Sequence, residues 1–71
     1  MNFTLGKLVL LWRKTAEGWG NIGRRNEALA QEHEGHFHQS EALIFRQRAA
    51  NAYDHQRRAL ERADALERGG L

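Results

Sequence analysis

The sequence predicts an all-α fold in which two long helices pack as an antiparallel hairpin. Three observations lead to this prediction. The 71 residues include no proline and no cysteine, and alanine, leucine, glutamate and arginine dominate, a composition that favours long helices. Apolar residues recur every three or four positions in two segments, which is the spacing of one helix face. A short segment, residues 32–38, with three histidines and a single glycine, Gly35, separates these two segments.

The first helix is expected over about residues 3–33, with Asn2 or Thr4 as its cap. Three glycines inside it, Gly18, Gly20 and Gly23, each cost about 1 kcal/mol relative to alanine in a helix interior. The sequence therefore leaves open a kink or a break at Gly18–Gly23, and with it a three-helix alternative. The helix carries an apolar row that we interpret as its buried seam: Leu5, Leu8, Trp12, Trp19, Ile22 and Leu29. A second row of small residues, where another helix can approach closely, follows at a spacing of seven: Val9, Ala16, Gly23 and Ala30.

The second helix is expected over about residues 38–68, after a turn at about 34–37 in which Gly35 ends the first helix. Folding the chain back about Gly35-His36 places Trp12 opposite Ala59 and Trp19 opposite Ala52. Large residues then meet small ones, as close packing of two helices requires. The seam of this helix consists of Ala42, Phe45, Ala49, Ala52, Gln56, Ala59, Ala63 and Leu66.

Self-association is expected because the chain, a single domain over residues 1–71, is too short to bury a large core. A domain of this size buries only about 60% of its unfolded surface, and no disulfide stabilises it. A dimeric four-helix bundle would cover the apolar residues that lie off the seam. We assign these residues to an interface with a second copy or with a partner protein: Leu10, Leu11, Phe37, Leu43, Ile44, Tyr53 and Leu60.

These features favour a small, non-catalytic helical protein that binds or inhibits a partner protein. In size and composition the chain is similar to small accessory proteins of bacteria and their viruses, which regulate larger proteins. Catalysis is not expected, because there is no cysteine and a thin hairpin offers no pocket of useful size.

Charge suggests a nucleic-acid or nucleotide binder as the alternative function. The net charge is only +2, but residues 1–25 carry +4 and residues 26–45 carry −4. Arginines that could form a phosphate-binding patch also stand three or four residues from acidic side chains, as on an ordinary solvent-exposed helix face. The candidate patch consists of Arg24, Arg25, Arg46, Arg48, Arg57 and Arg58.

A histidine cluster in the turn gives a second alternative, a metal-responsive oligomer. His33, His36 and His38 lie within six residues, beside Glu32 and Glu34. Imidazoles and carboxylates suit zinc, although this spacing is not a defined zinc motif and also fits a solvated polar turn. No other cofactor is expected.

No membrane segment is expected either. The longest apolar run, Leu8–Trp12, is far shorter than the ~20 residues that span a bilayer, and its flanks lack a signal-peptide layout. These features predict a cytoplasmic protein without a membrane partner.

Overall fold

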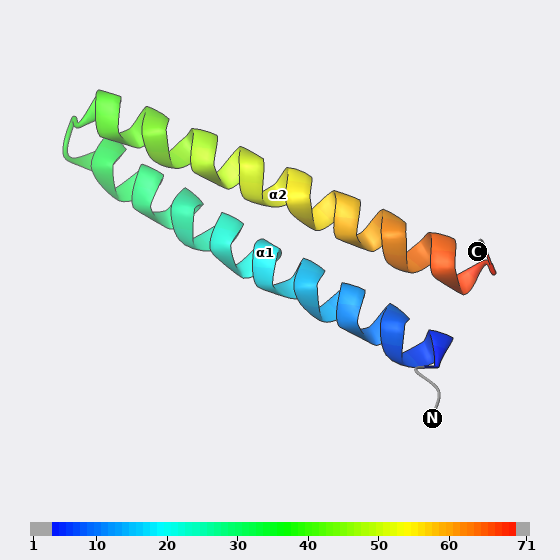
Figure 1. Ribbon diagram of the computed structural model, residues 1–71. Coiled ribbons are helices and arrows are strands. Elements are labelled where there is room, and N and C mark those ends of the chain that lie inside the picture. Colours follow the sequence, from blue (N-terminus) through cyan, green and yellow to red (C-terminus); the bar gives the residue numbers. More distant parts are fainter. Residues whose placement is uncertain (1–3, 70–71) are drawn as a thin grey trace.

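The computed structural model describes residues 4–69, which form a helical hairpin, as the sequence predicts. Helix α1 (Leu5–Gly35) and helix α2 (Gln39–Glu67) are joined by three residues. The start of α1 and the end of α2 lie together at one end of the molecule, and the turn lies at the other (Figure 1). Asn2 and residue 3 lie outside the described residues, whereas the Thr4 hydroxyl caps α1 by accepting a hydrogen bond from the Lys7 amide at 3.2 Å.

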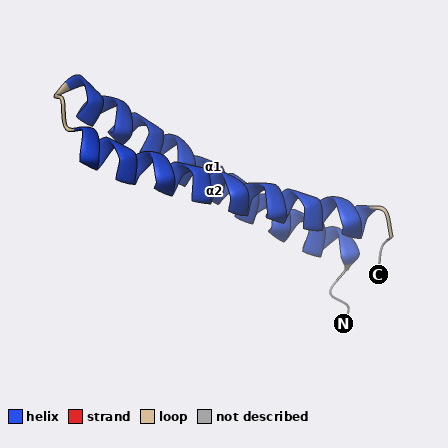
Figure 2. Cartoon of the chain, turned by 90° about the horizontal axis from the view of Figure 1, so that it is seen from above, coloured by secondary structure: helices blue, strands red, loops and turns tan. Residues whose placement is uncertain are grey.

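The hairpin is a flat rod that is only one helix thick. It measures 54 × 18 × 12 Å, and an α-helix with its side chains is about 10–12 Å wide. Its radius of gyration is 16.1 Å, against about 11 Å for a compact domain of this length. The view from above shows the two helices overlapping along the rod (Figure 2). A single copy therefore leaves both wide faces of the hairpin uncovered.

Helix α1 is continuous through its glycines, so the three-helix alternative is wrong. Gly20 and Gly23 are both buried against α2. A Cβ atom at Gly23 would lie 2.6 Å from the Tyr53 ring, and one at Gly20 would lie 2.5 Å from the Gln56 side-chain amide. Glycine at these two positions lets side chains of α2 lie directly on the backbone of α1. This close packing offsets the conformational cost of glycine in the helix.

The core between the helices consists almost entirely of small side chains. The predicted seam of α2 is confirmed, since its six aliphatic members are buried and Phe45 and Gln56 are partly buried. The predicted seam of α1 is confirmed only in part: Leu8, Trp12, Trp19 and Leu29 are partly buried, whereas Leu5 and Ile22 remain 38% and 46% exposed. The fully buried residues of α1 belong to its small-residue row, which faces α2. The buried core is Val9, Ala16, Ala30, Ala42, Ala49, Ala52, Ala59, Ala63 and Leu66.

The pairing of small with small residues has a physical reason. Two helices that meet through alanine and glycine can bring their backbones closer together and gain dispersion contacts along their whole length. The bulky residues of α1 are then displaced to one side of the contact. As a result, no large side chain among the described residues is fully buried.

The turn lies slightly later in the chain than predicted, and the register shifts with it. Residues 36–38 lie between the helices, and Phe37 adopts the left-handed conformation with φ +62°. Trp12 now lies beside Arg62, and Trp19 stacks on His55, about one helical turn from the pairing that the sequence predicts.

Within residues 4–69, the hydropathy of the two helices bears on whether either could span a membrane. Neither α1 nor α2 contains a stretch that is both long and apolar enough to cross a bilayer.

Candidate functional site

One wide face of the hairpin carries both tryptophans together with several other bulky residues that are not fully buried, and we call it the aromatic face. At its centre, Trp12 and Trp19 border a hollow of about 280 Å³, together with Thr15, His55, Arg58, Ala59 and Arg62. Residues seven positions apart share a helix face, so Leu8, Ile22 and Leu29 lie in the same row as Thr15. The aromatic face thus consists of Leu8, Trp12, Thr15, Trp19, Ile22, Leu29, Phe45, Arg48, His55, Arg58 and Arg62.

Each aromatic ring on this face lies against a nitrogen-bearing side chain. The Arg62 guanidinium carbon lies 5.6 Å from the centre of the Trp12 ring, and the His55 ring stacks on Trp19 with 4.4 Å between centroids. Near the turn, the Arg48 guanidinium carbon lies 5.4 Å from the centre of the Phe45 ring. Such cation–π and stacking contacts are favourable. They hold the long side chains of α2 flat against the rings.

The opposite wide face, the polar face, is bridged by pairs between the helices. Arg13 pairs with Glu67, the Tyr53 hydroxyl donates to Glu27 at 2.7 Å, and Arg46 donates two hydrogen bonds to Glu34 at 2.6 and 2.7 Å. The three bridging residues of α1 are separated from one another by multiples of seven positions, and so are the three bridging residues of α2. The bridges therefore align in one row and fix the register of the two helices.

These bridges also shift the ionisation of the groups that form them. The hydrogen bonds from Arg46 lower the pKa of Glu34. The hydrogen bond to Glu27 raises the pKa of Tyr53, because it stabilises the protonated phenol. Solvent-exposed pairs contribute little net stability. Their main effect is to specify how the two helices align.

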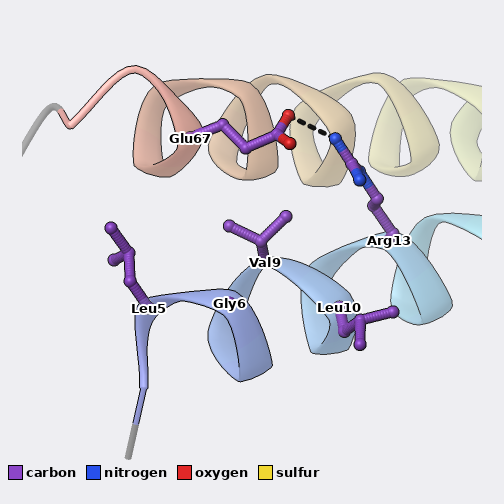
Figure 3. Close-up of a pocket in the computed structure, with 6 residues that line it drawn as sticks. All are labelled: Leu5, Gly6, Val9, Leu10, Arg13 and Glu67. Carbon is purple, nitrogen blue, oxygen red and sulfur yellow. Dashed lines mark hydrogen bonds and ion pairs between the residues drawn. The ribbon is translucent and has the colours of Figure 1, made fainter.

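The open end of the hairpin holds a second hollow, of about 360 Å³. Val9 points toward α2 there, whereas Leu10 points away from it, and the Arg13–Glu67 pair closes one side (Figure 3). The remaining lining residues are Leu5 and Gly6.

The predicted arginine patch is spread along the hairpin. Arg24 bonds Asn21 and lies near Tyr53 on the polar face, whereas Arg46 lies near the turn with Glu34. Arg25 is exposed on α1, and Arg48 lies on the aromatic face over Phe45. Arg57 and Arg58 both pair with Asp54, at 2.5 and 3.1 Å, and Arg57 also pairs with Glu61. Acidic partners thus neutralise three of the six arginines: Arg46, Arg57 and Arg58.

The predicted interface residues do not form a single patch. Five are exposed along the helices: Leu10, Leu11, Leu43, Ile44 and Leu60. Phe37 is 87% exposed in the turn. Tyr53 is half-buried and covers Gly23 from α2.

The sequence does not predict the aromatic face, because its apolar spacing places Trp12 and Trp19 in the core. A signal for this face is nevertheless present in the sequence. Arg48, His55 and Arg62 follow one another at intervals of seven, as Trp12 and Trp19 do, so each row lies on one face of its helix.

The predicted histidine cluster is only partly assembled in the turn. The Nδ1 atoms of His33 and His38 lie 3.2 Å apart, whereas the ring centres of His36 and His38 are 6.2 Å apart. Within residues 4–69, no three histidine, aspartate or glutamate side chains stand together in an arrangement that could hold a metal ion.

Comparison with known proteins gives no relative: no protein-family model, curated protein or solved structure matches the chain. The function therefore has to be argued from the hairpin and its side chains.

Proposed function

We propose that this chain is a non-catalytic binding protein that self-associates through its aromatic face and thereby presents a helical surface to a partner protein. In the arrangement we favour, two hairpins stack to form a dimeric four-helix bundle with antiparallel neighbouring helices. The observation that carries the proposal is the row of bulky apolar side chains on one face of a rod only 12 Å thick.

The packing of the single hairpin supports a second layer. Its core contains seven alanines, one valine and one leucine among the buried hydrophobic residues, which is a small core for 71 residues. Trp12 and Trp19 are only partly buried, and Ile22 is 46% exposed. A second layer over these side chains would remove their remaining exposed apolar area from water.

The dimensions of the aromatic face also suit a helical partner layer. The hairpin as a whole extends about 54 by 18 Å, and the aromatic face occupies the part of one wide side between Leu8 and Leu29 of α1. Each partner in a standard interface contributes roughly 800 Å². Arg48 and Arg62 lie at the side of this face. Their aliphatic stems can remain in contact with the rings while the charged ends reach the rim of a bundle.

Light scattering after size-exclusion chromatography tests the proposal across a dilution series. The wild-type chain is expected at twice its monomer mass. Ile22→Glu places a charge in the aromatic face and should yield a monomer, because an unpaired carboxylate is costly in an apolar interface. Leu10→Glu is the matched control, since Leu10 is exposed outside this face, and it should keep the wild-type mass.

A monomeric wild-type chain would overturn self-association. A dimer whose mass is unchanged by Ile22→Glu but lost with Leu10→Glu would show that a different surface forms the interface.

A further inference from the structure

The turn of the hairpin brings two histidines together by means of the backbone itself. The His38 amide donates a hydrogen bond to the His33 carbonyl at 2.7 Å, and the His36 amide donates to the same oxygen at 3.2 Å. Phe37, with φ +62°, reverses the chain direction within this short loop. The two residues whose rings meet are therefore also tied to each other through the main chain.

The ring of His33 is held in place by the second helix. It stacks on Phe45 of α2, with 5.2 Å between centroids and an angle of 11° between the ring planes. Phe45 is itself partly buried and is covered by Arg48. Both helices thus restrict the orientation of this imidazole before any ligand binds.

The distance between the two rings fits a shared metal ion. A tetrahedral ion with metal–nitrogen bonds of about 2.0–2.1 Å requires its donor nitrogens to be roughly 3.3–3.4 Å apart. The Nδ1 atoms of His33 and His38 are 3.2 Å apart. The observed spacing is therefore close to the bite of a two-histidine chelate.

The neighbouring groups indicate how such a site is completed. Glu34 is engaged by two hydrogen bonds from Arg46, so it is a poor donor for a metal ion. His36 is exposed, and its ring centre is 6.2 Å from that of His38. Rotation of this free side chain would bring a third imidazole toward the pair, and water can fill the remaining position.

From this geometry, we propose that the turn binds a divalent transition-metal ion, zinc or copper, through Nδ1 of His33 and Nδ1 of His38, with His36 as an auxiliary ligand. Neutral imidazole is a common ligand for both ions. On binding, whichever ring carries its proton on Nδ1 releases that proton to solvent and takes up a proton from solvent on Nε2, so that both rings remain neutral and both Nδ1 lone pairs are available to the metal ion. The site lies in one hairpin and does not depend on self-association.

The test is a titration of the full chain with zinc chloride and with copper chloride by isothermal calorimetry, in a buffer that does not bind metal. We expect saturation at about one ion per chain. His33→Asn and His38→Asn should each weaken binding by about tenfold or more, since loss of even an outer-shell partner of a metal ligand costs that much. His36→Asn should have a smaller effect.

His55→Asn is the matched control, because His55 is the one histidine outside the His33–His38 segment and stacks on Trp19. This variant should bind metal as the wild type does. Circular dichroism of each variant checks that the helices remain formed. Wild-type affinity in His33→Asn and His38→Asn, or an equal loss in His55→Asn, would overturn the proposed ligands.

A measurement on the wild-type chain avoids dependence on any variant. Two-dimensional NMR of the imidazole nitrogens reports which nitrogen coordinates the metal. Zinc should shift the Nδ1 resonances of His33 and His38 and leave those of His55 in place. Absence of a shift at saturating zinc would exclude the site.

Discussion

At the scale of single residues, the effect of a glycine on the stability of this chain depends on which atoms a side chain at that position would contact. Gly18 has nothing within 4 Å of the position of a Cβ atom, whereas Gly23 faces three atoms of the Tyr53 ring at 2.6–2.9 Å. Both glycines weaken the helix to the same degree through backbone entropy. Only Gly23 compensates for this cost, by allowing a side chain of α2 to pack directly on the backbone of α1.

The two glycines should therefore respond in opposite directions to alanine. Gly18→Ala is expected to raise the free energy of unfolding by about 1 kcal/mol, the usual gain in helix propensity. Gly23→Ala is expected to lower it by about 1 kcal/mol, because an overpacking cost of roughly 2 kcal/mol exceeds that gain. Urea denaturation followed by circular dichroism measures both values. Equal stabilisation by the two substitutions would show that the Tyr53 ring moves away freely.

At the scale of the helices, the sequence predicts more about α2 than about α1. In α2 the apolar row and the row of small residues coincide, because alanine supplies most of both, so the seam is unambiguous. In α1 the apolar row and the row of small residues are separate but adjacent. The apolar row contains Trp12 and Trp19, and the small-residue row contains Ala16 and Gly23. Hydropathy favours the first row, but the distance between the helix axes selects the second. That distance arises only when both helices are packed together.

Of the histidine site at the turn, the sequence predicts the position in the chain but not the geometry. The histidines could be placed at the turn from the sequence, since Gly35 marks the end of the first helix. The short distance between His33 and His38 could not, because it depends on the left-handed Phe37 and on the stacking of His33 over Phe45. Sequence spacing alone does not specify either of them.

The bridge between Glu34 and Arg46 predicts how the pairing of the helices near the turn depends on pH. The pKa of Glu34 is lower in the folded chain than in the unfolded chain, where it is about 4.3. Its contribution to stability is therefore complete above this unfolded value and is lost as the pH falls through the folded pKa. We expect the wild-type chain to lose stability in acid more steeply than Glu34→Gln does.

The measurement is a set of urea denaturation curves between pH 7 and pH 2. Glu32→Gln is a suitable control, because Glu32 is a nearby exposed carboxylate that forms no side-chain bond within residues 4–69. It should keep the acid sensitivity of the wild type. The same pH profile in Glu34→Gln and wild type would mean that the bridge is not formed in solution.

At the scale of the whole molecule, the six candidate arginines are distributed over residues 4–69 in such a way that they do not form one joint cationic patch. Arg46, Arg57 and Arg58 pair with carboxylates, and Arg24 and Arg48 lie on opposite faces of the rod. Tight phosphate binding requires several cations that act together and release counterions. The arrangement therefore gives these arginines little means of binding phosphates jointly.

We accordingly expect no binding of single-stranded DNA or RNA at physiological salt. Fluorescence anisotropy with labelled oligonucleotides at low and at physiological salt provides the measurement. Any association at low salt should disappear as salt is added, and Arg25→Ala should change it no more than Lys14→Ala does. Binding that persists at physiological salt and is lost specifically with Arg24→Ala or Arg25→Ala would instead support the nucleic-acid alternative.

The placement of both helix ends at the open end of the rod determines how the molecule responds to mechanical load. Tension applied through Leu5 and Glu67 acts across the hairpin, so the two helices separate like a zipper and do not slide past each other. The Arg13–Glu67 pair is among the first contacts to be loaded, and the small-residue layers behind it then open in turn. Because few layers resist at any moment, we expect separation at low force, with the turn at His36 opening last.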